Sequence, residues 1–160
     1  MTGQATAYSE VATARQAVLR VAEPTPGAGW TEPSVSRYSP RTSDEQRVLD
    51  ALAMVVDPCS IATGAPLSIH DMGLVREIEV TPGAATIRLR LTSPVCFQIG
   101  LICEAIEKRV QALDLACVIE VDPVDPWSTD LMSDDARERL KRQREMQASR
   151  WLQAVGPRKY

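Results

Sequence analysis

The fold of this chain is decided by residues 85–113, which read ATIRLRLTSPVCFQIGLICEAIEKRVQAL. Apolar residues alternate with Thr and Arg over residues 85–91, and this period of two predicts a strand with one buried face. Ser93 and Pro94 follow, a good N-cap and a proline suited to the first helical position. Apolar residues then recur every three or four positions to residue 113, which predicts an amphipathic helix of about five turns.

A hairpin and a helix are predicted upstream of this unit. Residues 74–80 pair with the strand, because residues 81–84, Thr-Pro-Gly-Ala, suit a type II turn. Ser43 and Gln46 form a capping box ahead of apolar residues at helical spacing, which predicts the start of a helix. Pro58 is expected to end that helix, since the residue before a proline is disfavoured in the α region.

One more strand and one more helix complete the predicted fold. Residues 116–121 predict the strand, and Ser133 caps a basic helix that runs to about residue 150. The order is therefore helix, strand, strand, helix, strand, helix. This order predicts an α/β (α+β) two-layer sandwich, in which a small mixed sheet containing the hairpin packs on helices.

The chain divides into three regions by composition. Residues 23–42 contain four prolines and two glycines, so residues 1–42 are predicted to form a flexible N-terminal arm. Within the arm, residues 10–22 have the spacing of a short amphipathic helix. Residues 43–128 form the predicted folded domain, and residues 129–160 form a basic C-terminal helix and tail.

The net charge of −3 is unevenly distributed. Residues 1–43 carry four basic against three acidic residues, residues 44–135 six against sixteen, and residues 136–160 eight against two. An acidic body with a basic tail argues against nucleic acid as a partner. The tail itself either contacts an acidic partner or forms a solvated helix.

Composition and apolar runs indicate the class of protein. With 44% apolar and 24% charged residues the chain is globular in composition. No apolar run approaches the roughly 20 residues that span a bilayer, and no signal-peptide pattern opens the chain. We therefore expect a cytoplasmic protein with no membrane partner.

The four cysteines and the single histidine limit metal chemistry. In a chain that is not secreted, four cysteines do not suggest a disulfide framework, and no two of them form a CxxC pair. One histidine excludes a multi-histidine metal centre within one chain. Any metal site here has an incomplete ligand set, so it binds transiently or borrows ligands from a second chain.

Cys96 is the most suggestive residue. If Ser93 caps the helix, Cys96 lies inside the first turn, where unpaired N–H groups and the helix dipole stabilise a thiolate. The alternative is a small apolar residue packed under the sheet. Cys103 and Cys117 fall on apolar faces and are expected in the core, whereas Cys59 lies in a predicted loop and is a candidate ligand.

His70 and Asp71 form the other polar cluster. A carboxylate beside an imidazole can orient it as a ligand or a base, but adjacent residues in an extended segment point in opposite directions. Asp71 can equally cap the turn that contains Gly73. We favour the structural role, in which Asp71 caps the turn, over a ligand or base formed by His70 and Asp71.

These pieces together resemble the metal–sulfur cluster assembly factors of the domain-of-unknown-function-59 type, over about residues 44–140. That family includes the PaaD and SufT proteins of bacteria and a cytosolic iron–sulfur assembly factor of eukaryotes. The matching motifs are Val56-Asp57-Pro58, His70-Asp71-Met72-Gly73-Leu74-Val75, Leu91-Thr92-Ser93-Pro94-Val95-Cys96, Asp125-Pro126-Trp127-Ser128 and Met132-Ser133-Asp134-Asp135-Ala136.

The resemblance implies a site as well as a fold. The family's cysteine corresponds to Cys96, the expected primary iron ligand. Cys59 stands where the family usually has glutamate, and His70 where it commonly has a hydrophobic residue, so this chain has two further candidate ligands. The motif residues expected to support the site are Asp57, Asp71, Thr92 and Ser93.

The resemblance also implies a function. It suggests a non-catalytic accessory protein that helps deliver iron or an iron–sulfur cluster, transiently bound, to a client apo-protein. The comparison with PaaD suggests an oxygenase or monooxygenase component as the client. One cysteine cannot hold a cluster, which usually needs four ligands, so a homodimer or the client must complete the shell.

Two other classes of function stay open. The chain could be a metal-free interaction module that scaffolds an oxygenase or a chaperone complex. It could also be a thiol enzyme that uses Cys96 as nucleophile and His70 as base, although no oxyanion partner beyond backbone amides is evident.

Overall fold

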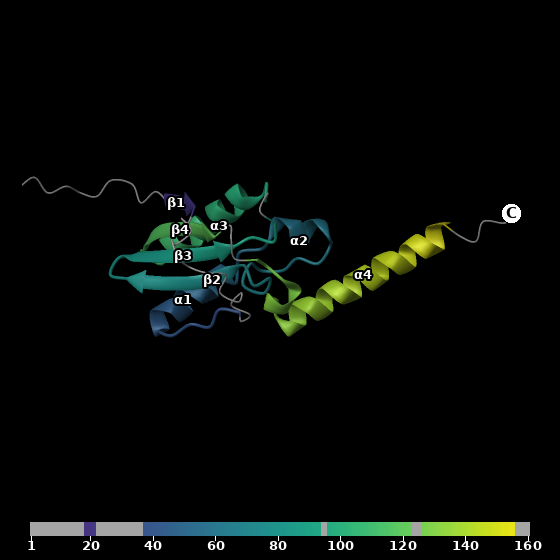
Figure 1. The fold of residues 1–160 in the computed structure, drawn as a ribbon, viewed down its shortest axis with the longest axis horizontal. Helices are drawn as coiled ribbons and strands as arrows, with labels where there is room; N and C mark the ends of the chain where they lie inside the picture. Colours follow the sequence, from purple (N-terminus) through teal and green to yellow (C-terminus); the bar gives the residue numbers. More distant parts are fainter. Residues whose placement is uncertain (1–17, 22–36, 94–95, 123–125, 156–160) are drawn as a thin grey trace, which may run out of the picture.

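The computed structural model describes residues 18–21, 37–93, 96–122 and 126–155. Its sheet has four strands in the order β1-β4-β3-β2. The pair β2–β3 is antiparallel, whereas β3–β4 and β1–β4 are parallel, so the sheet is mixed (Figure 1). The elements are β1 (Val18–Val21), α1 (Ser43–Leu52), α2 (Pro58–Ala62), β2 (Val75–Thr81), β3 (Ala84–Arg90), α3 (Ile99–Gln111), β4 (Ala116–Asp122), the 3₁₀ helix η1 (Thr129–Leu131) and α4 (Asp134–Val155).

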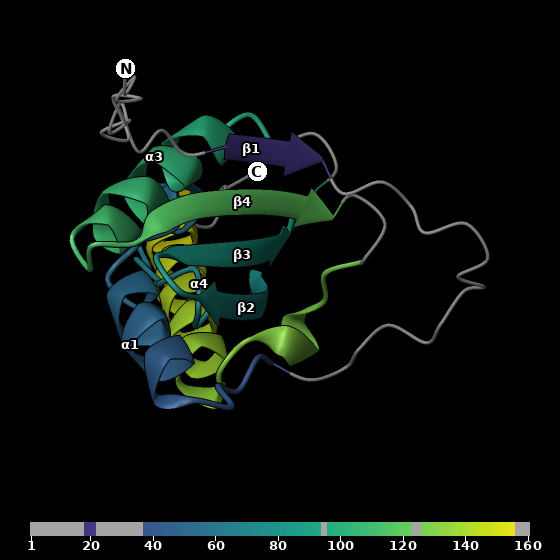
Figure 2. The ribbon, with the colours of Figure 1, turned by 90° about the vertical axis from the view of Figure 1, so that its left-hand side faces the viewer.

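The predicted two-layer architecture is confirmed. Helices α1 and α3 contact each other, α1 contacts β2, and α3 contacts β4, so both helices cover one face of the sheet (Figure 2). The core between them consists of aliphatic side chains, as the low aromatic content requires. Its most buried members include Val48, Leu52, Ile78, Ile87, Leu89, Ile106, Val110 and Ile119.

The other face of the sheet is polar. Glu77, Arg88 and Glu120 occupy one register across β2, β3 and β4. The Arg88 guanidinium donates to Glu77 at 2.5 Å and to Glu120 at 2.8 Å. Alternation along β3 therefore separates an apolar face from a charged one, as its period of two predicts.

The β2–β3 hairpin forms as predicted. Thr81 pairs with Ala84, which leaves Pro82 and Gly83 at the centre of the turn. Gly83 has φ +82°, the value that a type II turn requires at its third position.

Helix α1 differs from the prediction at both ends. Its N-cap is Thr42, whose hydroxyl accepts from the Glu45 N–H at 3.1 Å, so the cap lies one residue before Ser43. The helix ends at Leu52, because the chain then extends to form a bridge with Ser68. Pro58 does not end this helix but begins the next one.

Helix α3 begins later than predicted. Its first residue is Ile99, and its N-cap, Gln98, makes no side-chain capping bond. Ser93 is therefore not the cap, while Pro94 and Val95 lie outside the described residues. A Ser-Pro pair favours turns as well as helix starts, and here a bend after β3 separates the strand from the helix.

The terminal regions contain one correction. Val18–Val21 is strand β1, paired in parallel with β4, where a helix over residues 10–22 was predicted. The edge of β4 offers unpaired backbone groups that a strand satisfies and a helix does not. Residues 10–17 and 22 lie outside the described residues.

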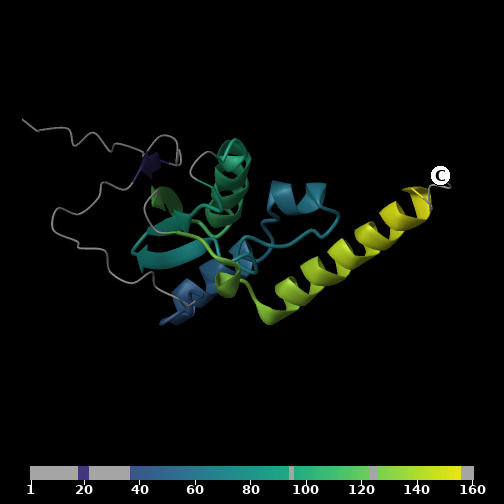
Figure 3. The ribbon, with the colours of Figure 1, turned by 45° about the vertical axis from the view of Figure 1, so that its right-hand side comes forward.

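Helix α4 begins as predicted. The Ser133 hydroxyl accepts from the Ala136 N–H at 3.2 Å, which confirms Ser133 as its cap. The helix continues to Val155, beyond the predicted end, and its later turns project away from the sheet (Figure 3). No helix in the described ranges is long and apolar enough to cross a membrane.

Candidate functional site

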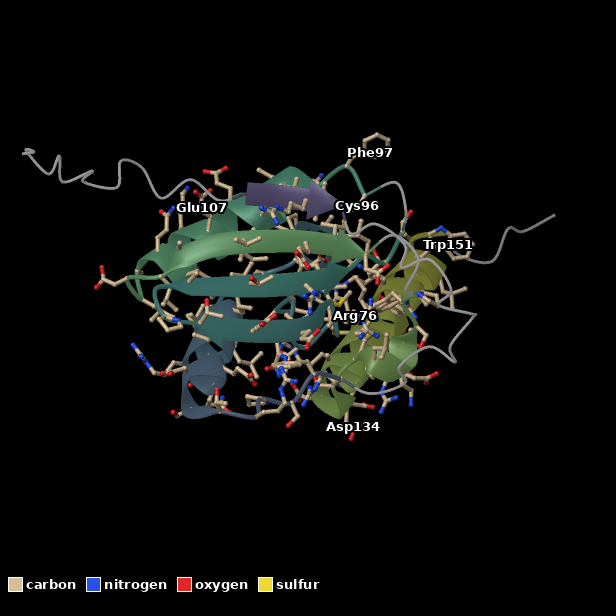
Figure 4. The ribbon with its side chains drawn as sticks, turned by 60° about the vertical axis from the view of Figure 1, so that its left-hand side comes forward. Arg76, Cys96, Phe97, Glu107, Asp134 and Trp151 are labelled. Carbon is tan, nitrogen blue, oxygen red and sulfur yellow. The ribbon has the colours of Figure 1, made fainter. Side chains whose placement is uncertain are left out.

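The candidate site lies where the chain leaves β3 and enters α3. Cys96 is half-buried there, and its carbonyl accepts from the Ile99 N–H at 3.4 Å. The neighbouring side chain of Phe97 is 94% exposed. Figure 4 shows Phe97 projecting outward from the same corner as Cys96. This corner therefore presents a thiol beside an exposed aromatic ring.

The predicted position of Cys96 inside the first helical turn is wrong. Cys96 precedes Ile99, the first residue of α3, by three positions, because the N-cap is Gln98. The first N–H groups of the helix bond to the Gln98 carbonyl, which accepts from Leu101 and Ile102. The thiol is thus held by the loop before the helix.

Cys59 lies in α2, not in a loop. Asp57 and Pro58 are the N-cap and first residue of this short helix, a start signal that the sequence prediction treated as a helix end. The Asp57 carboxylate is buried and accepts from the Ser60 N–H at 2.7 Å. Asp57 therefore fixes the first turn of α2 and the position of Cys59, whose side chain is exposed.

Cys59 and Cys96 are close enough for the charge of one to act on the other. Partial burial raises the pKa of the Cys59 thiol, and the nearby charges of Asp57 and Cys96 raise it further. Burial also raises the pKa of Cys103, again with a smaller contribution from Cys96. Cys96 thus interacts electrostatically with a thiol on α2 and with a thiol on α3. Cys117 is 1% exposed in the core, as predicted.

His70 has different neighbours. Its side chain is half-buried, and its Nδ1 is buried without a hydrogen-bond partner in the described part of the chain. Burial lowers the pKa of His70, Arg37 lowers it further, and Asp71 partly offsets both. The imidazole is therefore neutral at pH 7, which is the form that binds metals. Among the residues that the structure describes, no three His, Cys, Asp or Glu side chains form a group that could hold a metal ion.

Asp71 anchors the C-terminal segment to the site. Its carboxylate accepts from Ser68 Oγ at 2.8 Å and from Ser133 Oγ at 3.0 Å, and its carbonyl accepts from the Ser133 N–H at 2.9 Å. Trp127 adds a bond from Nε1 to the Met72 carbonyl at 2.6 Å. Asp71 thus connects two of the quoted motifs, which supports the structural role favoured for it.

Gly73 lets these segments approach closely. It has φ +70°, and a Cβ placed there would lie 2.3 Å from the Leu131 carbonyl oxygen. Any side chain at this position would displace η1. The turn that contains His70 and the start of α4 therefore form one packed unit.

Thr92 and Ser93 lie in the bend between β3 and Cys96. Thr92 is exposed and Ser93 is half-buried, and neither caps α3. They shape the path of the chain toward the thiol instead of stabilising the helix start.

Arg90 was missed by sequence reasoning. Alternation in β3 assigns it to the solvent face with Arg88, yet Arg90 is only 1% exposed. It ends β3 in register with Asp122 at the end of β4, close in the chain to Cys96. Arginine is almost never fully buried unless it is paired, so we expect the burial of Arg90 to serve a specific role at this end of the sheet. Its place at the end of a predicted strand was the only signal.

These features define a small α+β domain with a mixed sheet and a thiol at the strand–helix corner. A crystal structure of a domain of unknown function 59 from Bacillus anthracis is similar to it. The identity is 25% and the TM-score 0.54, over 60% of this chain and 90% of that chain.

The family follows from the sequence of the same region. A model described as "Iron-sulfur cluster assembly protein" matches residues 45–123, and the chain belongs to that family through this domain.

Two further solved structures are similar. A conserved hypothetical protein from Thermotoga maritima has 24% identity and a TM-score of 0.46, over 64% of this chain and 94% of that one. A Mycobacterium tuberculosis protein described as associated with iron–sulfur complex assembly and repair has 25% identity and a TM-score of 0.38, over 67% and 94%. No curated protein matches this chain.

Proposed function

We propose that this protein holds iron or an iron–sulfur cluster transiently at Cys96 and helps deliver it to a client apo-protein. Its family assigns the chain a role in iron–sulfur cluster assembly. The observation that carries the finer proposal is that Cys96, half-buried before α3, and Cys59, exposed on α2, are accessible thiols close enough for their charges to interact. Two thiols bind iron without enclosing it, so the cargo can leave by ligand exchange.

His70 is the third ligand in this proposal. Thiolate and neutral imidazole both suit iron, and the low pKa of His70 keeps its imidazole neutral. In the described conformation His70 lies among Arg37 and Asp71. It would join Cys59 and Cys96 through a movement of its turn or from a second copy of the chain.

A second chain must complete the ligand shell of a cluster, which usually has four protein ligands. The client apo-protein or a homodimer would supply the missing ligands. The resemblance of the sequence motifs to the PaaD proteins is the ground for proposing an oxygenase or monooxygenase component as the client, in the cytoplasm of a bacterium. In this role the protein is not an enzyme, because it transfers a cargo and transforms no substrate.

Anaerobic iron titration tests this proposal. We compare the wild type with Cys96→Ser, Cys59→Ser and His70→Ala, and use Cys117→Ala, a thiol in the core, as the control. Iron binding should be abolished in Cys96→Ser, weakened in Cys59→Ser and His70→Ala, and unchanged in the control. Loss only in Cys96→Ser would remove the two additional ligands from the proposal, and undiminished binding by Cys96→Ser would refute it.

A metal-free scaffold is the second candidate. It is favoured by the lack of any three-residue metal-ligating group in the part of the chain that the structure describes. Negligible iron uptake by all variants, together with intact client activation, would support this function over delivery.

A further inference from the structure

Helix α4 extends beyond the domain that it caps. Two of its early residues and one later residue contact the body: Ala136 is 1% exposed, Arg139 donates to the Pro66 carbonyl at 2.8 Å, and Gln147 donates to the Thr63 carbonyl at 2.8 Å. Residues 144–154 are all exposed. Figures 1 and 3 show these last turns leading away from the sheet.

Trp151 marks the projecting turns as an interface. It follows Gln147 by four positions and so continues the stripe of α4 that faces the body, yet it is 63% exposed (Figure 4). Leu152 is 65% exposed and Met146 is 49% exposed on the same helix. Tryptophan, methionine and arginine are the residues enriched where proteins bind each other, and tryptophan and arginine dominate binding energy there.

The charge of this segment is opposite to that of the body. Residues 139–154 contain five basic residues and one acidic residue, whereas residues 44–135 contain six basic and sixteen acidic residues. Beside α4, a groove of about 620 Å³ runs along residues 64–66 and is lined by Arg139, Arg142, Met146 and Arg150. The projecting helix and the groove beside it are thus positively charged, whereas the domain that carries them is negatively charged.

We propose that the projecting turns of α4 dock on the acidic body of a second copy of this chain. Charge complementarity selects this occupant, because each copy has one basic helix and one acidic body. The exchange is reciprocal, as a two-fold dimer requires. Basic residues surround α4 on all sides, unlike a membrane-bound helix, which separates them from an apolar face.

This inference deepens the proposed function by assigning a surface to the homodimer, but its test involves no iron. Sedimentation velocity of the full chain over a wide concentration range should show a reversible dimer at about 50 mM salt. The dimer should dissociate at about 500 mM salt, where surface charges are screened. Cys96→Ser should dimerise like the wild type, so failure of iron delivery and failure of dimerisation are separate outcomes.

Two variants and one control locate the interface. Trp151→Ala and Arg150→Glu should each weaken the dimer by about tenfold or more. Leu19→Ala, a truncation at a side chain that is 53% exposed on β1, outside both α4 and the acidic body, should leave dimerisation unchanged. Helical circular dichroism verifies that each variant is folded.

Several results would overturn the inference. These are a monomer at every concentration in low salt, a dimer that both variants preserve, and a dimer indifferent to salt. A monomer that binds vesicles of anionic lipid would assign α4 to a membrane surface instead.

Discussion

Replacing Gly73 by alanine should destabilise this protein far more than the same change at another glycine with positive φ. At Gly73, φ is +70°, and the new Cβ would lie 2.3 Å from the oxygen and 2.7 Å from the carbon of the Leu131 carbonyl. The left-handed conformation costs alanine about 1–2 kcal/mol. Overpacking against a backbone group that cannot rotate away adds about 1–3 kcal/mol. The expected loss is therefore about 2–5 kcal/mol in the free energy of unfolding.

A similar loss in the free energy of unfolding follows if the structure relaxes around the added methyl group. If η1 moves away from the added methyl group, the Trp127 bond to Met72 and the two bonds between Ser133 and Asp71 are weakened. Each is worth about 1 kcal/mol. Either route separates the His70 turn from the start of α4, so the variant should also lose protection at the N-terminus of α4.

Gly83→Ala is the matched control. Gly83 has φ +82°, but a Cβ there has no atom within 4 Å, so only the conformational cost of about 1–2 kcal/mol applies. Urea unfolding followed by circular dichroism gives both free energies, and hydrogen exchange of the first turns of α4 reports the local loss. If Gly73→Ala and Gly83→Ala destabilise the chain equally, the close approach of Gly73 to Leu131 contributes nothing and the reasoning fails.

Two further predictions concern titratable side chains. Because burial lowers the pKa of His70 below its ordinary value of 6.5, His70 disfavours the folded state only when it must be protonated. His70 should not affect the free energy of unfolding above pH 6.5. Below pH 6.5 this free energy should fall until the pH reaches the lower pKa that His70 has in the folded state. Urea midpoints of His70→Gln should lack this pH dependence, and a pH profile identical to that of the wild type would contradict the prediction. Burial raises the pKa of Cys117 to about 12, so alkylation of the folded protein at pH 8, followed by mass spectrometry, should modify Cys59 and Cys96 well before Cys117. Modification of Cys117 at the rate of Cys59 would show that the core opens readily.

Local patterns in the sequence were sufficient for β2, β3 and β4 and for the hairpin, but not for the edge strand β1. Alternation in β3, a Pro-Gly turn and helical spacing in α1 and α3 each depend on residues close in the chain. Side-chain direction in a strand or helix follows from its period, so the buried apolar residues of these elements could be predicted without knowing the topology, whereas the buried Arg90 could not. The motifs that identify the family are also local runs, such as His70-Asp71-Met72-Gly73.

Helix boundaries were less predictable, because the same residues serve more than one local structure. Asp-Pro at 57–58 suits the end of α1 by its sequence, yet it starts α2. Ser93-Pro94 suits the start of α3, yet Ser93 lies in a bend and the helix begins at Ile99. In both places contacts with other segments of the same chain decide where the helix begins or ends; the bridge between Val56 and Ser68 is an example.

The site itself was determined only by tertiary structure. Cys59 and Cys96 are far apart in the sequence, and only the fold places them close enough for their charges to interact. The bond between Ser133 and Asp71 likewise joins residues 62 positions apart, and the burial of Arg90 goes against the alternation of its own strand. Periodicity tells which way a side chain points from its own strand or helix. What lies in that direction is set by the long-range packing of the whole chain, so the sequence alone could name the candidate ligands but not group them.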